Sequence, residues 1–331
     1  MPEDTTLALF GATGNIGTEL LKALRSTATE KSKILVFTRG DPAATQSKFD
    51  LDGRFECLSL PYVDDILNTE ALATILKSYA LQTSFVCIPE KSVDKAPQFV
   101  DPIATALKQA GIVRVIKVGT GVPDKYEYGR RHLKAEQLIR DKGLKLTVLQ
   151  AGDISTNPHW LGPSPPGAPY ALHDVFKALS YLSFFGFLFR SMGTCVDMIG
   201  GGRTPFMDLR DYGEALAVVL LDPAKHDGKT YRIVSTPHVR ISDIAREYGK
   251  LLNRTIYVVN PTEEDKRMLL GMEGYKGTMA DIIIEMFDRF SEGIYDYDSD
   301  DFTKLTGRPP RTLTDFCKEK VQANGKPISL W

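Results

Sequence analysis

The chain has 331 residues, with 41 lysine and arginine residues against 42 aspartate and glutamate residues. This length is enough for two domains with a large core. The balanced charge gives no broad electrostatic field toward nucleic acid or an anionic membrane surface. We therefore expect no nucleic-acid partner.

The four cysteines, Cys57, Cys87, Cys195 and Cys317, lie far apart in the sequence and form no CxxC pair. This spacing predicts reduced thiols and no metal site. The first six residues, MPEDTT, are acidic and lead directly into an apolar strand, which leaves no room for a secretory signal. Together these features indicate a cytoplasmic protein.

Residues 7–17 (LALFGATGNIG) run from an apolar strand through a GxxGxxG pattern into an amphipathic helix. In such a turn Gly11 allows the tight bend, Gly14 lets the backbone approach a pyrophosphate, and Gly17 allows the helix to pack closely on the strand. Backbone N–H groups at the helix N-terminus then face the anion. The pattern predicts a dinucleotide site rather than a plain structural turn, and the other candidate contacts in it are Thr13, Asn15 and Ile16.

The second predicted strand, residues 33–38, ends with Thr38 and Arg39. A site for NAD would normally have an aspartate or glutamate here, which binds the ribose hydroxyls. An arginine instead matches the 2′-phosphate of NADP with charge-assisted hydrogen bonds. We therefore expect NADP(H) as the cofactor, with Thr38 and Arg39 in contact with it; the alternative for Arg39 is a solvated side chain at a strand end.

Apolar strands alternate with helical patterns through residues 1–156. Strands are predicted at residues 7–10, 33–38, 55–60, 83–88, 113–118 and 144–149, and helices at residues 69–79, 100–110 and 132–142. This alternation predicts an α/β fold, a Rossmann-type doubly wound parallel sheet with helices on both faces. Ligands bind beyond the carboxyl ends of such strands, so Pro89 and Gly119, which follow the fourth and fifth strands, are further candidate cofactor contacts.

A cluster of proline and glycine at residues 158–169 marks the start of a second region, residues 157–331. Helices are predicted at residues 208–221 and 241–252, strands at residues 230–234 and 255–259, and a helix start after Pro309 and Pro310. We expect a smaller C-terminal α/β substrate region that is partly interleaved with the Rossmann sheet. The uncharged run at residues 178–189 is too short for a transmembrane segment, which needs about 20 residues; a buried helix, a lid over a pocket and an interfacial helix are the three interpretations.

Several segments resemble NmrA-like proteins in their order and spacing. They are GATGNIG, the FTR end of the second strand, residues 132–157 (HLKAEQLIRDKGLKLTVLQAGDISTN), residues 205–216 (PFMDLRDYGEAL) and residues 305–316 (LTGRPPRTLTDF). NmrA-like proteins are atypical members of the short-chain dehydrogenase/reductase superfamily, which also includes isoflavone reductase-like enzymes and ergot-alkaloid reductases. The resemblance implies a Rossmann domain with a smaller substrate region, and either NADPH-dependent reduction of small molecules or sensing of the nucleotide.

The same resemblance identifies candidate catalytic residues. The superfamily uses a tyrosine and a lysine four residues apart, in which the cation lowers the pKa of the phenol. Those positions are Tyr128 and His132 here, so the tyrosine is present and the lysine is not. Lys134 is turned about 200° from His132 on a helix and is not expected to replace it. The serine of the superfamily corresponds to Thr120. The alternative for Tyr128 is an aromatic residue in a loop, and for His132 a residue of the helix start without a chemical role.

These features predict an NADPH-dependent reductase of NmrA type acting on an apolar small molecule, in particular an intermediate of secondary metabolism. The expected state is a monomer or a homodimer. Two alternatives remain open at this point: a redox-neutral isomerase, dehydratase or cyclase on the same scaffold, and a non-catalytic regulator that senses NADP. Substrate-dependent oxidation of NADPH separates the three.

Overall fold

A seven-stranded sheet, in which every neighbouring pair of strands is parallel, is the centre of the first of two structural units. The computed structural model describes residues 5–63, 66–88, 95–154, 194–253, 255–272 and 274–323. The first unit comprises Met1–Ala151, Leu209–Ile233 and Asp300–Pro309, and the second Gly152–Asp208, Val234–Ser299 and Pro310–Trp331. Each unit is described here by itself.

The strands of the large sheet lie in the order β12-β8-β7-β6-β1-β2-β3. Their bounds are β1 Thr6–Phe10, β2 Lys33–Thr38, β3 Phe55–Ser59, β6 Thr83–Val86, β7 Arg114–Thr120, β8 Lys145–Ala151 and β12 Thr230–Ile233. The order changes direction between β1 and β6, which is the switch point where ligands bind in such sheets. The predicted Rossmann-type, doubly wound fold is confirmed. Strand β12 comes from beyond residue 157 and pairs with β8.

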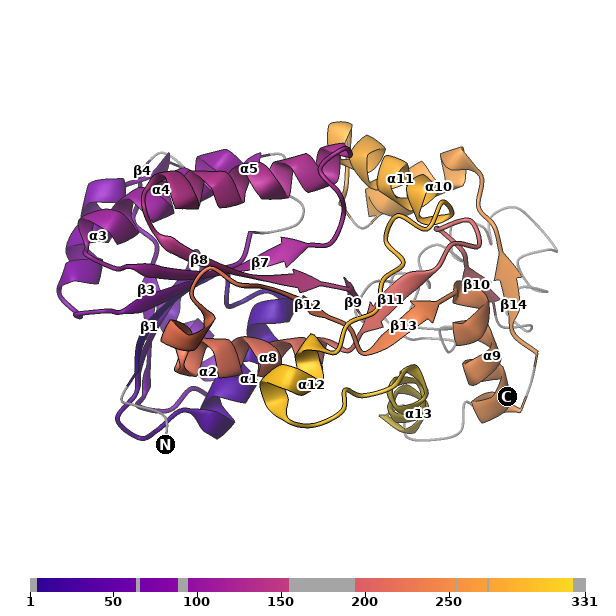
Figure 1. Cartoon of the computed structure of the whole chain (residues 1–331), viewed down its shortest axis with the longest axis horizontal. Helices are drawn as coiled ribbons and strands as arrows, with labels where there is room; N and C mark the ends of the chain where they lie inside the picture. Colours follow the sequence, from indigo (N-terminus) through magenta and orange to yellow (C-terminus); the bar gives the residue numbers. More distant parts are fainter. Residues whose placement is uncertain are drawn as a thin grey trace. The chain divides into compact units, whose positions relative to one another are not determined.

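Helices cover both faces of this sheet (Figure 1). Helices α3 (Thr69–Lys77), α4 (Ala96–Gln109) and α5 (Glu127–Asp141) lie side by side on one face, and α1 (Asn15–Thr27) packs against α8 (Leu209–Leu221) on the other. Strands β1 and β2 also contact each other through stacked rings: the centroids of Phe10 and Phe37 are 4.7 Å apart. Side chains of the central strands, such as Leu7 and Leu9, are fully buried, as expected for strands covered on both faces.

Short elements complete the first unit. They are α2 (Pro42–Lys48), the antiparallel pair β4 (Tyr62–Val63) and β5 (Ile66–Leu67), the 3₁₀ helix η3 (Pro223–His226) and α12 (Asp301–Thr306). Helix α12 contacts α8. The segment after α12, which carries Arg308, therefore returns to the same helix that packs on α1.

The second unit contains two small sheets and four helices within its described residues. Strand β11 (Thr204–Met207) pairs with β9 (Asp153–Ile154) and β13 (Thr236–Val239), and β10 (Thr194–Val196) pairs with β14 (Tyr257–Val259). The helices are α9 (Ile241–Leu252), α10 (Glu263–Met272), α11 (Thr278–Phe290) and α13 (Leu313–Ala323). Phe206 of β11 is fully buried, and its ring centroid lies 5.3 Å from that of Phe316 of α13. This contact anchors α13 on the three-stranded sheet.

Two helices begin earlier than predicted. Helix α4 begins at Ala96 rather than at residue 100, and helix α5 begins at Glu127 rather than at residue 132, so Tyr128 lies on the helix and not in a loop. Helix α13 begins at Leu313, after the two prolines as predicted, and reciprocal hydrogen bonds between Thr312 and Asp315 cap it there. The proline and glycine cluster at residues 158–169 and the apolar run at residues 178–189 lie outside the described residues. None of the described helices is long and apolar enough to cross a membrane.

An ion cluster connects the segment after α12 to α8. The Arg308 guanidinium donates to Asp211, at 2.8 Å, and to Glu214. Asp211 is fully buried, and the guanidinium also lies 4.8 Å from the centroid of the Phe302 ring. Both carboxylates raise the pKa of Arg308, Glu214 more strongly. Since a buried carboxylate needs a cation or hydrogen-bond donors, this cluster stabilises the unit.

We expect Arg308→Met to lower the free energy of unfolding by about 2 kcal/mol. This is less than the 3 to 5 kcal/mol typical of a broken buried pair, since water can reach the partly exposed guanidinium site. Chemical denaturation measures the change. Lys304→Met, which removes an exposed cation paired with Asp300 on α12, is the matched control and should leave stability almost unchanged. Equal losses in the two variants would contradict a special role for the Arg308 cluster.

Candidate dinucleotide and catalytic site

The glycine turn after β1 is held by contacts that only a residue without a side chain allows. Gly11 has a φ of +84°, and a Cβ at this position would lie 2.3 Å from the carbonyl oxygen of Cys87, directly after β6. A Cβ on Gly17 would lie 2.3 Å from Cα of Ala12. Both glycines are therefore required by the packing of the chain on itself.

Gly14 differs from its two neighbours in the motif. A Cβ at Gly14 would meet only the carbonyl oxygen of Gly11, at 3.7 Å, which is an ordinary contact. Its backbone, with φ −82° and ψ −178°, is open to any residue type. Nothing within the described part of the chain therefore requires a glycine at this position. The space over Gly14 fits a group that approaches the backbone from outside the chain.

The N-terminus of α1 has the features of an anion site. Gly14 is its N-cap and offers no side chain to the first turn, which also contains no acidic residue. Thr13, Gly14 and Asn15 are exposed, whereas Ile16 is buried and belongs to the core. The backbone N–H groups and dipole of this helix can therefore hold a phosphate group.

At the end of β2, Arg39 is exposed and forms no ion pair or hydrogen bond with the described residues. Thr38 is buried, and its hydroxyl accepts a hydrogen bond from the backbone N–H of Gly40 at 3.0 Å. Asp41, the first acidic residue after the strand, caps α2 by accepting from the N–H of Ala44. The carboxylate is thus engaged in capping, and the guanidinium of Arg39 is the charged group that this loop can offer to a ligand.

Gly119 and Thr120 lie within β7, not in the loop that the sequence predicts. A Cβ on Gly119 would lie 2.4 Å from Cγ1 of Val148 on β8. The hydroxyl of Thr120 accepts a hydrogen bond from the backbone N–H of Val122 at 3.1 Å. Packing against Val148 therefore explains the glycine at position 119, and the Thr120 hydroxyl stabilises the turn after the strand. Pro89 lies outside the described residues.

Helix α5 brings Tyr128 and His132 together at its first turns. Their ring centroids are 4.9 Å apart. Gly129 fixes this start, since a Cβ there would lie 2.2 Å from the carbonyl oxygen of Pro123. The contact places the phenol and the imidazole on one face of the helix, where both can approach the same ligand.

His132 is 8% exposed, and neither ring nitrogen has a hydrogen-bond partner among the described residues. Burial lowers its pKa well below the ordinary value, and the charge of Lys117 lowers it further. The imidazole is therefore neutral near pH 7. It cannot act as the permanent cation that a lysine would provide at this position, but it has one donor and one acceptor nitrogen available for a ligand.

A buried charge cluster beneath α5 was not predicted from the sequence. Lys117 of β7 is fully buried, and its Nζ lies 3.7 Å from Oε1 of Glu136 on α5. Glu136 also pairs with Arg140, at 3.4 Å. A lysine inside the apolar strand VIKV was the available signal, because a charged residue in a strand buried on both faces needs a partner.

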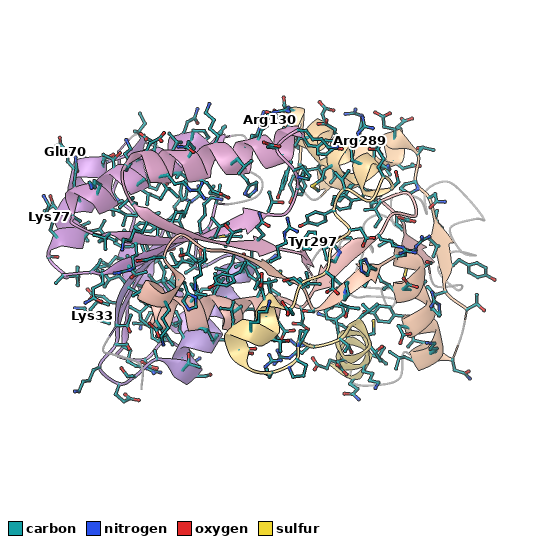
Figure 2. The ribbon with its side chains drawn as sticks, in the orientation of Figure 1. Lys33, Glu70, Lys77, Arg130, Arg289 and Tyr297 are labelled. Carbon is teal, nitrogen blue, oxygen red and sulfur yellow. The ribbon has the colours of Figure 1, made fainter. Side chains whose placement is uncertain are left out.

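The cations at the outer surface of α5 are paired locally. Arg130 and Arg131 donate to Glu127 at 2.9 and 2.6 Å, and they lower its pKa, Arg131 more strongly. Figure 2 shows Arg130 on the outer side of the helix, away from the sheet. These side chains form a solvated charged surface, apart from the buried His132 and Lys117 and the half-buried Tyr128.

Comparison with known proteins gives relatives over nearly the whole chain, although no family model matches. Quinone oxidoreductase 2 of Escherichia coli is 26% identical over 321 residues, which cover 96% of this chain and 99% of the relative. An NAD(P)H azoreductase of Xenophilus azovorans is 25% identical over 67% of this chain and 70% of its own length. The crystal structure of NmrA, a negative transcriptional regulator in complex with NADP, matches with a TM-score of 0.66 at 17% identity, covering 99% of this chain and all of the other. The chain thus shares the fold of the NADP-bound NmrA structure over nearly its whole length.

Proposed function

We propose that the protein is an NADPH-dependent reductase of apolar, conjugated small molecules, with quinones as the first class to test. The proposal of NADPH as the cofactor rests on two features: the open space over Gly14 and the exposed guanidinium of Arg39. A pyrophosphate at the N-terminus of α1 and a 2′-phosphate at the end of β2 would use these two features. The names of the curated relatives, a quinone oxidoreductase and an azoreductase, support the substrate class.

The bound cofactor supplies a hydride, and the protein supplies position and protons. Reduction of a quinone to a hydroquinone takes up two electrons and two protons; the hydride carries both electrons and one proton, so one further proton must come from the protein or from water. The phenol of Tyr128 is the proposed donor to the quinone oxygen, and neutral His132 is proposed to orient that oxygen through a hydrogen bond. The resemblance to the superfamily supports the role of the tyrosine. The ring nitrogens of His132, which have no hydrogen-bond partner among the described residues, support the role of the imidazole.

Thr38 and Gly119 remain proposed parts of the cofactor site through their backbone, since the Thr38 hydroxyl is engaged with Gly40 and Gly119 has no side chain. Thr120 remains a weaker candidate for polarising a carbonyl, because its hydroxyl already accepts from Val122. A secondary-metabolite intermediate is kept as a substrate proposal within the apolar class. The cytoplasm is the proposed location, and a monomer or homodimer the proposed state.

Two other functions are weighed against this proposal. A redox-neutral isomerase, dehydratase or cyclase would convert its substrate with the cofactor unchanged. A regulator would bind NADP without turnover, and the likeness in fold to NmrA favours this second candidate. NADPH absorbance in the presence of quinones and azo compounds separates them: reductase activity consumes NADPH only when substrate is present.

Gly14→Val should abolish NADPH binding, with a loss of affinity of more than about 100-fold, while the protein still folds. The branched side chain would fill the space that the pyrophosphate needs, and the Gly14 backbone accepts any residue. Calorimetric titration and circular dichroism on one preparation measure both effects. Gly17→Val is the contrasting variant, because its side chain would collide with Ala12 and reduce stability. Unchanged affinity in a folded Gly14→Val protein would remove the turn from the phosphate site.

Arg39→Ala should weaken NADPH binding about 10- to 100-fold and leave NADH binding almost unchanged. The lost hydrogen bonds are charge-assisted and go to a phosphate that only NADPH carries, which corresponds to roughly 1.5 to 3 kcal/mol. Both cofactors are titrated against both proteins. Lys77→Ala, which removes an exposed cation from the outer surface of α3 (Figure 2), is the control and should affect neither. An equal loss for both cofactors would place Arg39 elsewhere.

Tyr128→Phe should lower turnover by roughly two to four orders of magnitude and leave NADPH affinity nearly unchanged, because it keeps the ring that contacts His132 and removes the proton. Steady-state rates with a quinone and a separate cofactor titration provide the two readouts. Tyr126→Phe, two residues earlier at the N-cap of the same helix, is the matched control and should keep its rate. If both variants turn over like the wild type, the proton comes from water or another group.

A further inference from the structure

Lys117 is fully buried in β7, between the buried apolar residues Ile116 and Val118. In the register of the sheet it is opposite Val86 of β6 and Val148 of β8. Its Nζ donates to the carbonyl oxygen of Val118 at 2.8 Å and lies 3.7 Å from Oε1 of Glu136. Burying an ammonium is costly even when it is paired, so an apolar residue would suit the sheet better. The fold alone gives no reason for this lysine.

The space beside Lys117 is left open for the carboxylate of Glu136. Gly119, two residues along β7, faces the same helix, and a Cβ there would lie 3.3 Å from Oε1 of Glu136. Glu136 lies one helical turn after His132, so the two share a face of α5. Strand and helix thus place the Lys117 ammonium beside Glu136, one helical turn from the imidazole.

The ionisable groups around Lys117 come from two further elements. Glu136 and Arg140 come from α5, and Cys87 follows β6; all three act electrostatically on Lys117 of β7. Tyr128 contacts the imidazole ring itself. Burial lowers the pKa of Lys117, whereas Glu136 acts in the opposite direction and favours the ammonium form. Of these groups, Lys117 is the one whose charge acts on the imidazole.

We propose that Lys117 is a positioning residue for His132: its buried ammonium, held by Glu136 and the Val118 carbonyl one helical turn from the imidazole, acts together with burial to favour the neutral ring beside Tyr128, with one donor and one acceptor nitrogen for the reacting group. This inference rests on the proposed function only in assigning the reacting group to the start of α5. A neutral imidazole has one donor and one acceptor nitrogen, which suits an uncharged carbonyl or hydroxyl group. The substrate class proposed for this site is therefore uncharged carbonyl compounds.

The test is a titration of the histidine side chains by NMR in the full-length protein without nucleotide, with the His132 signal assigned from a His132→Gln variant. In the wild type, His132 should protonate at a lower pH than a free histidine. Lys117→Met should move its protonation to higher pH, whereas Lys134→Met, which removes an exposed lysine of the same helix, should not. Protonation of wild-type His132 at the pH of free histidine overturns the proposal, and so does an unchanged titration in folded Lys117→Met.

The pH profile of quinone reduction gives a second readout that a purely structural lysine would not move. Loss of Lys117 lets His132 protonate at higher pH, so the acid-side fall in turnover should shift to higher pH in Lys117→Met and stay in place in Lys134→Met. The titration needs neither cofactor nor substrate. A shifted titration without reductase activity therefore rejects the proposed function and keeps this inference, whereas reductase activity with an unshifted titration does the reverse.

The stability of a variant with an added charge provides an independent check of the proposal. His132→Lys would bring a second ammonium next to Lys117 in a buried space, so it should lower the midpoint of chemical denaturation. Adding Lys117→Met removes the repulsion, and the double variant should recover most of that loss. Strictly additive effects of the two substitutions would show that positions 117 and 132 do not share one electrostatic environment, and would overturn the proposal.

Discussion

The close approach of backbone to backbone around the first glycine turn is the constraint on which the rest of the first unit depends. Gly17 brings α1 against Ala12, and Gly11 brings the turn against the chain that leaves β6. Gly213 continues this pattern on the far side of α1, because a Cβ there would lie 2.6 Å from the backbone of Glu19. The helix whose N-terminus forms the anion site is therefore clamped from both sides. A clamped helix keeps its N–H groups in a fixed direction, which an anion site requires.

Gly14 shows how the same motif separates folding from binding. Its neighbours in the motif are required by internal packing, whereas its own position is open. An open glycine at the N-cap of a helix leaves room for a ligand at the first turn, because no side chain occupies that space. This contrast is why a substitution at Gly14 reports on binding and one at Gly17 on stability.

The start of α5 combines two requirements that conflict. Apolar packing between α5 and the sheet favours neutral side chains, yet this interface contains Lys117, Glu136 and the imidazole of His132. The ammonium and carboxylate satisfy one another, while the imidazole has no partner in the described part of the chain. Buried polar groups of this kind concentrate where chemistry or ligand binding uses them. The same helix keeps Arg130 and Arg131 at its outer surface, paired with Glu127 and away from that interface.

Local sequence determined the parts of this protein that depend on neighbouring residues. The six predicted strands of residues 1–156 appear in the sheet with their ends shifted by at most two residues, because apolar runs and turn residues are properties of short segments. The glycine turn and the position of Arg39 at a strand end could also be predicted from the sequence. The turn motif lies within eleven consecutive residues, and composition marks the end of the strand. Tertiary structure alone decided that β12 joins the sheet beside β8 and that Lys117 of β7 pairs with Glu136 of α5, one helical turn from His132. These features depend on contacts between separate elements, whose free energy comes from burial and charge in the assembled sheet and is absent from any single segment.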